Sequence, residues 1–198
     1  MAVSRLWSTS SLEGLSFEMN APPIDDRTLP HLLAVLVLAS RIGDALSTYL
    51  LSPTLLLEMN VIVSRGGWSI ALLSLLVSLV PYYSTGLGVV VLTTSFLATG
   101  SNLSRCWVAR ALGEAEYRAI FLRAASRAKR SSALMLVLAS ASCPTFVGSL
   151  LMWFSGSETE WGYWFGLGIA LYGVAIALHG SSFVFQLFRE ASVEKPAV

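Results

Sequence analysis

Two opposite charges, Arg41 and Asp44, lie inside a run of the sequence that is otherwise largely apolar. Their spacing, continued by Thr48, places the three side chains on one face of a helix. An unpaired charge at the centre of a bilayer costs at least about 2.5–3.5 kcal/mol, so we expect the two charges to face inward and to pair. The pair is either an ion or proton site or a structural clasp between helices, and the sequence leaves both alternatives open.

Further polar residues recur at helical spacing in the later apolar segments. Asn102 and His179 each lie on a polar helix face, and Glu58 and Asn60 lie in the connection that follows the first apolar segment. If these faces point away from lipid, the side chains converge and can serve as each other's partners. The sequence therefore predicts one polar intramembrane cluster, with the members Arg41, Asp44, Thr48, Glu58, Asn60, Asn102 and His179.

Two carboxylates and one imidazole of this cluster, on Asp44, Glu58 and His179, are weak candidates for ligands of a divalent metal. The chain has only two histidines and no HxxxH or HxxE pattern, so neither a metal site nor another cofactor is predicted. A histidine hydrogen-bonded within the bundle is the preferred interpretation of His179. No GxSxG, Walker, GxGxxG or CxxC pattern is present, so no catalytic residue is predicted and a non-enzymatic role is favoured.

The composition indicates which elements position these residues. The chain has 198 residues, of which 55% are hydrophobic and 13% are charged, whereas soluble domains carry about 25% charged residues. A helix needs roughly 20 apolar residues to cross a bilayer core. We therefore predict an all-α, polytopic transmembrane bundle over 29–198, preceded by a polar tail over 1–28. The predicted spanning helices are 29–51, 68–83, 87–107, 133–154 and 163–188.

Two connections are long enough to form helices of their own. Residues 53–65 begin with a Ser-Pro pair typical of helix starts, which predicts a short interfacial or re-entrant helix with Glu58 and Arg65 on one face. Residues 108–131 are rich in alanine, leucine and arginine, which predicts a basic helical linker. This linker is either a patch for anionic lipid or an ordinary positively charged loop, and nothing in it favours nucleic acid.

The charges of the connections also predict an orientation. Basic residues gather between Arg105 and Arg130, whereas the next connection, SGSETEWGYW, is acidic and aromatic. The positive-inside rule then places 108–131 and the C-terminus in the cytoplasm and the N-terminus outside. We expect an integral protein of the bacterial inner membrane.

Part of the cluster resembles the signature of an uncharacterised family of small bacterial and archaeal integral membrane proteins. The residues that carry the resemblance are Asp44, Ser47-Thr48, Glu58-Met59-Asn60 and Asn102. In that family the first helix reads Asp-x-x-Ser/Thr-Thr and ends in Glu-x-Asn-Pro, and an asparagine follows two helices later. The resemblance covers about residues 35–107, and Val61 stands here where the family has proline. It implies a polar site in a membrane bundle without implying a particular chemistry.

The last predicted span has a second face, made of small residues, at a different angle from the face of His179. Small residues at helical spacing let backbones approach closely, so we expect this face to contact another membrane helix, either inside the protomer or across the interface of a homo-oligomer or larger complex. Membrane lipids are the other expected partners. The face consists of Gly162, Gly166, Gly173, Ala177 and Ser181.

Three classes of function fit these observations. The first is a non-catalytic subunit, or an assembly or interaction factor, of a membrane complex with a buried polar cluster. The second is a small ion or solute transporter that uses Asp44 and Glu58, although no inverted repeat is visible. The third is an intramembrane, metal-assisted hydrolase that acts on lipid or peptide. The sequence favours them in that order.

Overall fold

The computed structural model describes residues 27–193, so most of the predicted polar tail lies outside the described residues. The described residues form helices and short connections. Five helices among them are long and apolar enough to cross a membrane, which confirms the predicted all-α bundle and makes the chain a multi-pass membrane protein. Their bounds are Thr28–Leu51, Ile62–Tyr83, Thr85–Leu112, Arg130–Ser155 and Trp161–Val193.

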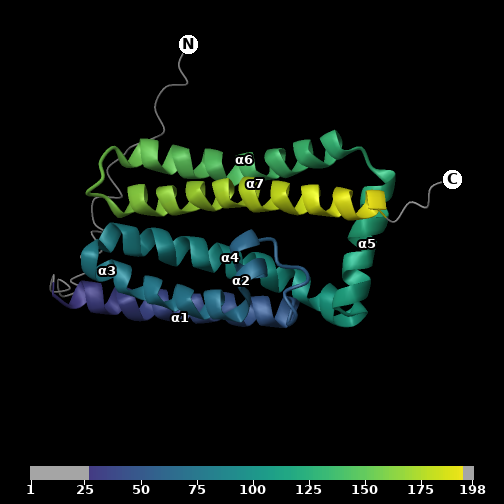
Figure 1. Ribbon diagram of the computed structural model, residues 1–198. Helices are drawn as coiled ribbons and strands as arrows, with labels where there is room; N and C mark the ends of the chain where they lie inside the picture. Colours follow the sequence, from purple (N-terminus) through teal and green to yellow (C-terminus); the bar gives the residue numbers. More distant parts are fainter. Residues whose placement is uncertain (1–26, 194–198) are drawn as a thin grey trace, which may run out of the picture.

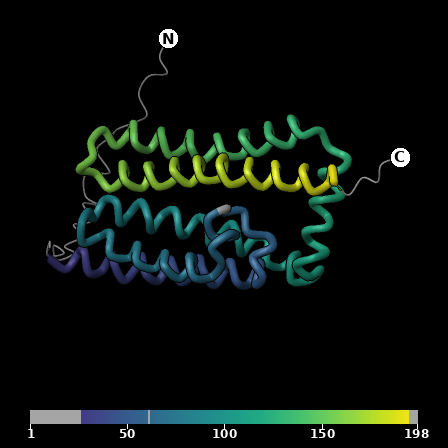
Figure 2. Tube along the Cα trace, in the orientation of Figure 1, coloured from purple at the N-terminus to yellow at the C-terminus, as the bar shows by residue number. Residues whose placement is uncertain are grey.

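The long helices pack as two pairs, which Figure 1 shows one above the other. Helix α6 (Arg130–Ser155) and helix α7 (Trp161–Val193) form one hairpin, and α1 (Thr28–Leu51) packs against α4 (Thr85–Leu112) in the other pair. Contacts between α4 and α7 join the pairs. Helix α5 (Glu114–Arg127) runs across one end of the bundle and connects them (Figures 1 and 2).

The connections sort onto two ends of the bundle. The end of α1, helix α5 and the end of α7 lie together, and the start of α1 lies opposite them with the turn before α4 and the α6–α7 connection (Figure 1). We call the first of these the basic end, because α5 and its neighbouring helix ends carry Arg110, Arg118, Arg123, Arg127 and Arg130. The predicted basic linker is therefore helical, although Gly113, with a φ of 82°, separates α5 from α4.

The hairpin of α6 and α7 depends on a close approach of their backbones. A Cβ added at Gly148 of α6 would lie 2.4 Å from the carbonyl oxygen of Gly166, and one added at Gly173 would lie 2.7 Å from the carbonyl oxygen of Ala141. Because these neighbours are backbone atoms, only glycine fits at this distance. The glycines of the small-residue face of α7 thus contact α6 within the same chain, which is the intramolecular form of the predicted contact.

The second span is irregular. It consists of α2 (Val61–Leu73), the 3-10 helix η2 (Ser74–Leu79) and the short helix α3 (Val80–Tyr83). Helix α2 is kinked at Gly67, whose φ of 65° and ψ of −162° belong to a backbone region that is essentially restricted to glycine. The kink divides α2 into a first part that follows the connection from α1 and a second part that continues into η2.

The helix predicted over 53–65 is wrong in its first half. Residues 52–60 form turns and irregular backbone, and α2 begins at Val61 with Asn60 as its cap, whose side chain accepts a hydrogen bond from the Ile62 amide. The predicted shared face of Glu58 and Arg65 does not exist, since the two residues do not lie on one helix.

The reason lies in Glu114, at the start of α5. Its carboxylate accepts hydrogen bonds from the Ser52 hydroxyl, from the amide and hydroxyl of Thr54, and from the Leu56 amide at 2.9 Å. The Leu57 amide donates to the Ser52 hydroxyl oxygen at 2.9 Å. The Leu56 and Leu57 amides, which a helix starting at Pro53 would bond to its own carbonyl oxygens, are therefore satisfied by side chains, so the segment can stay irregular.

Candidate functional site

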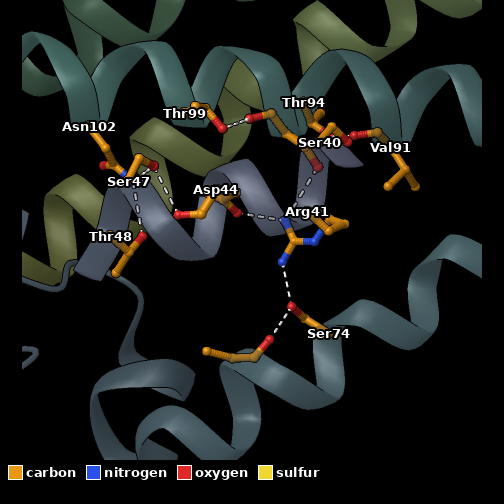
Figure 3. A network of polar contacts seen from close by, with 12 residues as sticks. Ser40, Arg41, Asp44, Ser47, Thr48, Ser74, Val91, Thr94, Thr99 and Asn102 are labelled. Atoms are coloured by element: carbon orange, nitrogen blue, oxygen red, sulfur yellow. Dashed lines mark hydrogen bonds and ion pairs between the residues drawn. The ribbon is translucent and has the colours of Figure 1, made fainter. Parts of the chain in front are cut away.

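The side chain of Arg41 joins three helical elements (Figure 3). Its Nη1 donates to Asp44 Oδ2 at 2.7 Å, which is the ion pair that the spacing predicts. The same nitrogen lies 3.3 Å from the Ser95 hydroxyl on α4, and Nη2 donates to the Ser74 hydroxyl on η2 at 2.7 Å. Arg41 and Asp44 thereby neutralise each other, and the Nη atoms of Arg41 also donate to helical elements that come later in the chain.

A second set of hydrogen bonds lies about one turn further along α1 (Figure 3). The Asn102 side-chain amide on α4 donates to the hydroxyls of Thr48 at 3.0 Å and of Ser47 at 3.3 Å. Ser47 in turn donates to the carbonyl oxygen of Asp44 at 2.9 Å. Asn102 therefore holds α1 and α4 together beside the ion pair, and the predicted partnership between the first and third spans is present.

All seven residues of the predicted polar cluster line a single cavity of about 640 Å³. Helices α1 and α4 contribute four of them, α7 contributes His179, and the connection after α1 contributes Glu58 and Asn60. Helix α6 closes a further side with Val137 and Ser140. The cavity thus lies between the two helix pairs, and Glu58, Met59, Asn60 and Val63 form part of its wall. Its role as a functional site stays a prediction.

The cavity also contains a charge that the sequence pattern does not assign to it. Arg105 of α4 lines the cavity, and its Nη2 donates to the Ser101 hydroxyl at 2.6 Å. From the sequence, Arg105 counts as one of the basic residues of a loop. Its spacing of three from Asn102, and of four from Ser101, would have placed it on the polar face of the helix.

Two charged residues of the cavity wall, Glu58 and Arg105, are not part of an ion pair. This holds for residues 27–193, which the structure describes. The Glu58 carboxylate accepts a hydrogen bond from the Asn60 amide at 2.7 Å. Burial raises the pKa of Glu58, and this outweighs the opposing effect of that hydrogen bond. The nearby Asp44 carboxylate raises the pKa further, and the guanidinium of Arg105 acts in the opposite direction. Glu58 is therefore a group of the cavity that binds a proton more readily than an ordinary glutamate.

The three weak metal candidates do not form a metal site in the described part of the chain. No group of three or more His, Cys, Asp or Glu side chains among these residues is arranged to hold a metal ion. Asp44 is bound to Arg41, and Glu58 is bound to the Asn60 amide. The hypothesis of metal-assisted hydrolysis consequently has no ligand set within residues 27–193.

No protein-family model, no curated protein and no solved structure matches this chain. The resemblance of Asp44, Thr48 and Asn102 to a family signature therefore stays a prediction. What the site can do has to be inferred from its own residues.

The first prediction concerns the ion pair. We expect Asp44→Ala to lower the stability of the protein by about 3–5 kcal/mol, because it leaves the Arg41 charge in a poorly solvated position. The double change Arg41→Ala with Asp44→Ala should cost less than the sum of the single changes, since it removes both charges together. Thermal unfolding of the four proteins in one detergent measures the coupling. Strictly additive losses would show that the two side chains do not interact.

The second prediction concerns Glu58 and uses Glu114 as its control. Because the pKa of Glu58 is raised by folding, its contribution to stability falls as the pH rises above about 4.3. Glu58→Gln should therefore gain stability relative to wild type between pH 4 and pH 7, as measured by unfolding in detergent.

Glu114 should behave in the opposite sense. Burial acts to raise its pKa, but the hydrogen bonds from Ser52, Thr54 and Leu56 outweigh burial and lower it. Its contribution is present above about pH 4.3 and is lost as the pH falls further. Glu114→Gln should thus be most destabilising near pH 7. Parallel pH profiles for the two variants would contradict the assignment of opposite shifts.

Proposed function

We propose that this membrane protein binds a small polar solute in the cavity between its helix pairs and carries it across the membrane. The observation that supports the proposal is the convergence of the seven polar residues on an open space of about 640 Å³. A polar cluster with a purely structural role would be expected to fill its own interior, because protein cores are packed as densely as organic crystals. Small-molecule sites typically enclose about 300–1,000 Å³, so the volume is suitable for a solute.

The charges of the wall indicate the class of solute. Arg41 and Asp44 neutralise each other, which leaves the carboxylate of Glu58 and the guanidinium of Arg105 to interact with an occupant. A small zwitterion, with one positive and one negative group, would satisfy both.

Glu58 is the residue that could couple binding to protons. Its raised pKa brings its protonation closer to neutral pH, and it lies on an irregular segment rather than inside a long helix. Ionisable groups that line polar cavities of membrane proteins commonly serve proton or ion pathways. In this proposal, protonation of Glu58 removes the negative charge that holds the cationic group of the solute.

A subunit or assembly role remains the alternative, and it makes a different prediction. It requires another chain that binds this one in fixed stoichiometry, whereas the transport proposal requires only the protein, lipid and solute. Gentle purification followed by mass spectrometry distinguishes the two.

We further propose that the basic end faces the cytoplasm of a bacterial cell and that the N-terminus lies outside. The arginines of α5 and its neighbouring helix ends support this orientation through the positive-inside rule. The connection between α6 and α7, which lies at the other end and carries Glu158 and Glu160, supports it as well.

The third prediction tests the solute site by filling it. Ala98 lines the cavity, so Ala98→Trp should occupy the space that a solute needs, whereas Ala39→Trp adds the same bulk on an exposed face of α1. Amino acids and betaines are screened at millimolar concentration for a rise in the melting temperature of the purified protein. At a concentration of 100 Kd a ligand stabilises by about 2.7 kcal/mol. We expect a hit to stabilise wild type and Ala39→Trp but not Ala98→Trp.

The hit is then offered, in radiolabelled form, to proteoliposomes that contain each protein. Uptake by wild type and Ala39→Trp, and none by Ala98→Trp, is the expected result. Equal binding by Ala98→Trp would place the solute elsewhere. The absence of any hit, together with a stoichiometric second chain in the purified material, would establish the assembly role instead.

The fourth prediction tests the orientation. In intact bacterial cells an impermeant maleimide should label Ser157→Cys, in the α6–α7 connection, and should label Ser126→Cys of α5 only after the membrane is opened. The unaltered protein measures the background from Cys106 and Cys143, which both lie inside spans. Labelling of Ser126→Cys, but not Ser157→Cys, in intact cells would reverse the orientation.

A further inference from the structure

A second cavity, of about 540 Å³, lies at the basic end of the bundle, and we call it the basal cavity. It is separate from the cavity of about 640 Å³ between the helix pairs, which we call the solute cavity. Most of its wall comes from one face of the last turns of α7, and the start of α6 contributes the rest. The two cavities share no residue among those that line them. The wall consists of Arg130, Phe185, Gln186, Phe188, Arg189 and Ser192.

Two arginines give this basal cavity its charge. Arg130 lies with its guanidinium carbon 4.0 Å from the centre of the Phe185 ring, a cation–π contact that holds the side chain across the gap between α6 and α7. Arg189 belongs to α7 and lies four residues after Phe185, so it shares that helix face. The planar guanidinium groups suit the oxygens of a phosphate.

The nearest acidic residue in the sequence does not neutralise these arginines. Both carboxylate oxygens of Glu190 lie 2.8 Å from Nη2 of Arg118 on α5, so this acid is already engaged. Within residues 27–193, neither Arg130 nor Arg189 forms an ion pair. The first turn of α6 also lacks an acidic residue, and its Lys129 cap makes no side-chain hydrogen bond. The start of α6 therefore adds its partial positive charge to the cavity.

An apolar stripe leads from the basal cavity along α7. Leu171, Leu178 and Phe185 are seven residues apart, so they lie on one helix face, and they are 45%, 64% and 44% exposed. Phe185 belongs to both the stripe and the cavity wall. A ligand that fits both features has a negative group at the basic end of the bundle and a hydrocarbon chain that extends toward its middle.

We propose that the basal cavity binds the phosphate of an anionic phospholipid, whose acyl chain lies along the Leu171–Leu178–Phe185 stripe. A soluble phosphate ester would share the interaction with Arg130 and Arg189 but would leave the stripe uncovered. Basic pockets between membrane helices near the headgroup level are typical sites for acidic headgroups. The proposal does not depend on the solute cavity or on transport.

Native mass spectrometry of the full chain in detergent tests the proposal. The protein is mixed with phosphatidylglycerol or with phosphatidylcholine of the same acyl chains, and the lipid-bound fraction is measured at several concentrations. We expect phosphatidylglycerol to be retained in preference to phosphatidylcholine. Arg130→Gln with Arg189→Gln should weaken the retention of phosphatidylglycerol about thirtyfold, which corresponds to roughly 1 kcal/mol for each of the two arginines near a headgroup.

The matched control is Arg110→Gln with Arg127→Gln. It removes the same charge from exposed positions at the basic end, and neither residue lines the basal cavity. Retention should stay within about threefold of wild type if the site is specific, since only diffuse attraction is lost. An equal loss in the two double variants would reduce the effect to overall charge and overturn the proposal. Melting temperatures confirm that all variants are folded, and Arg130→Lys with Arg189→Lys, which keeps both charges, should bind better than the glutamine pair.

Competition by soluble phosphates shows whether the ligand is a phospholipid or a soluble phosphate ester. Glycerol 3-phosphate and inorganic phosphate are added as competitors, and Leu178→Asn makes the stripe polar without touching either arginine. We expect the soluble compounds to compete poorly and Leu178→Asn to weaken lipid retention. Efficient competition by glycerol 3-phosphate, with lipid retention unchanged in Leu178→Asn, would assign the cavity to a soluble ester and overturn the lipid proposal.

Discussion

A guanidinium ion in an apolar segment has to find acceptors, and this requirement shapes one half of the bundle. Arg41 obtains them from Asp44 on its own helix, from Ser95 on α4 and from Ser74 on η2. The three elements are distant in sequence. For the contact with Ser74 to form, the irregular second span has to pack against α1. A donor that is shielded from water and lacks an acceptor is costly, so the contacts of the two Nη atoms with Asp44, Ser95 and Ser74 favour this arrangement of the three elements. The contacts of Arg41 thus help to hold α1 against α4, together with those of Asn102, and to bring the second span back to α1.

Much of this half follows from local rules that a sequence expresses directly. Hydrophobic length identifies the spans, because a bilayer imposes one thickness on every helix that crosses it. Helical spacing identifies the inward face, because a polar group such as Asn102 or His179 is disfavoured in lipid. Both rules act within one helix, so no knowledge of the partner is needed. The convergence of the polar faces on one cavity follows from the same reasoning, and so does the place of Arg105 on that face, although the volume of the cavity does not.

The connection after α1 could not be derived in this way, because its conformation is determined by a residue far along the chain. The Ser52-Pro53 pair is a normal start for a helix, and local preference favours one. The Glu114 carboxylate instead accepts hydrogen bonds from the Ser52 and Thr54 hydroxyls and from the Leu56 amide, and the segment adopts an irregular conformation around it. A contact over some sixty positions leaves no periodic trace in the sequence. The kink at Gly67 is similar, since a glycine pair can end a helix or bend it, and the surrounding tertiary structure decides which.

Arg118 gives the cavity wall a mechanical connection to the distant helix pair. Its guanidinium donates to the carbonyl oxygen of Leu56 with one nitrogen and to Glu190 at the end of α7 with the other. The segment that carries Glu58 is thus tied, through one side chain, to a helix of the opposite pair. A tilt of the α6–α7 hairpin relative to α1 and α4 would either displace this segment or break one of the two Arg118 contacts, with Leu56 or with Glu190. Arg118 therefore makes the position of the Glu58 segment depend on the position of α7 for as long as both of its contacts are kept.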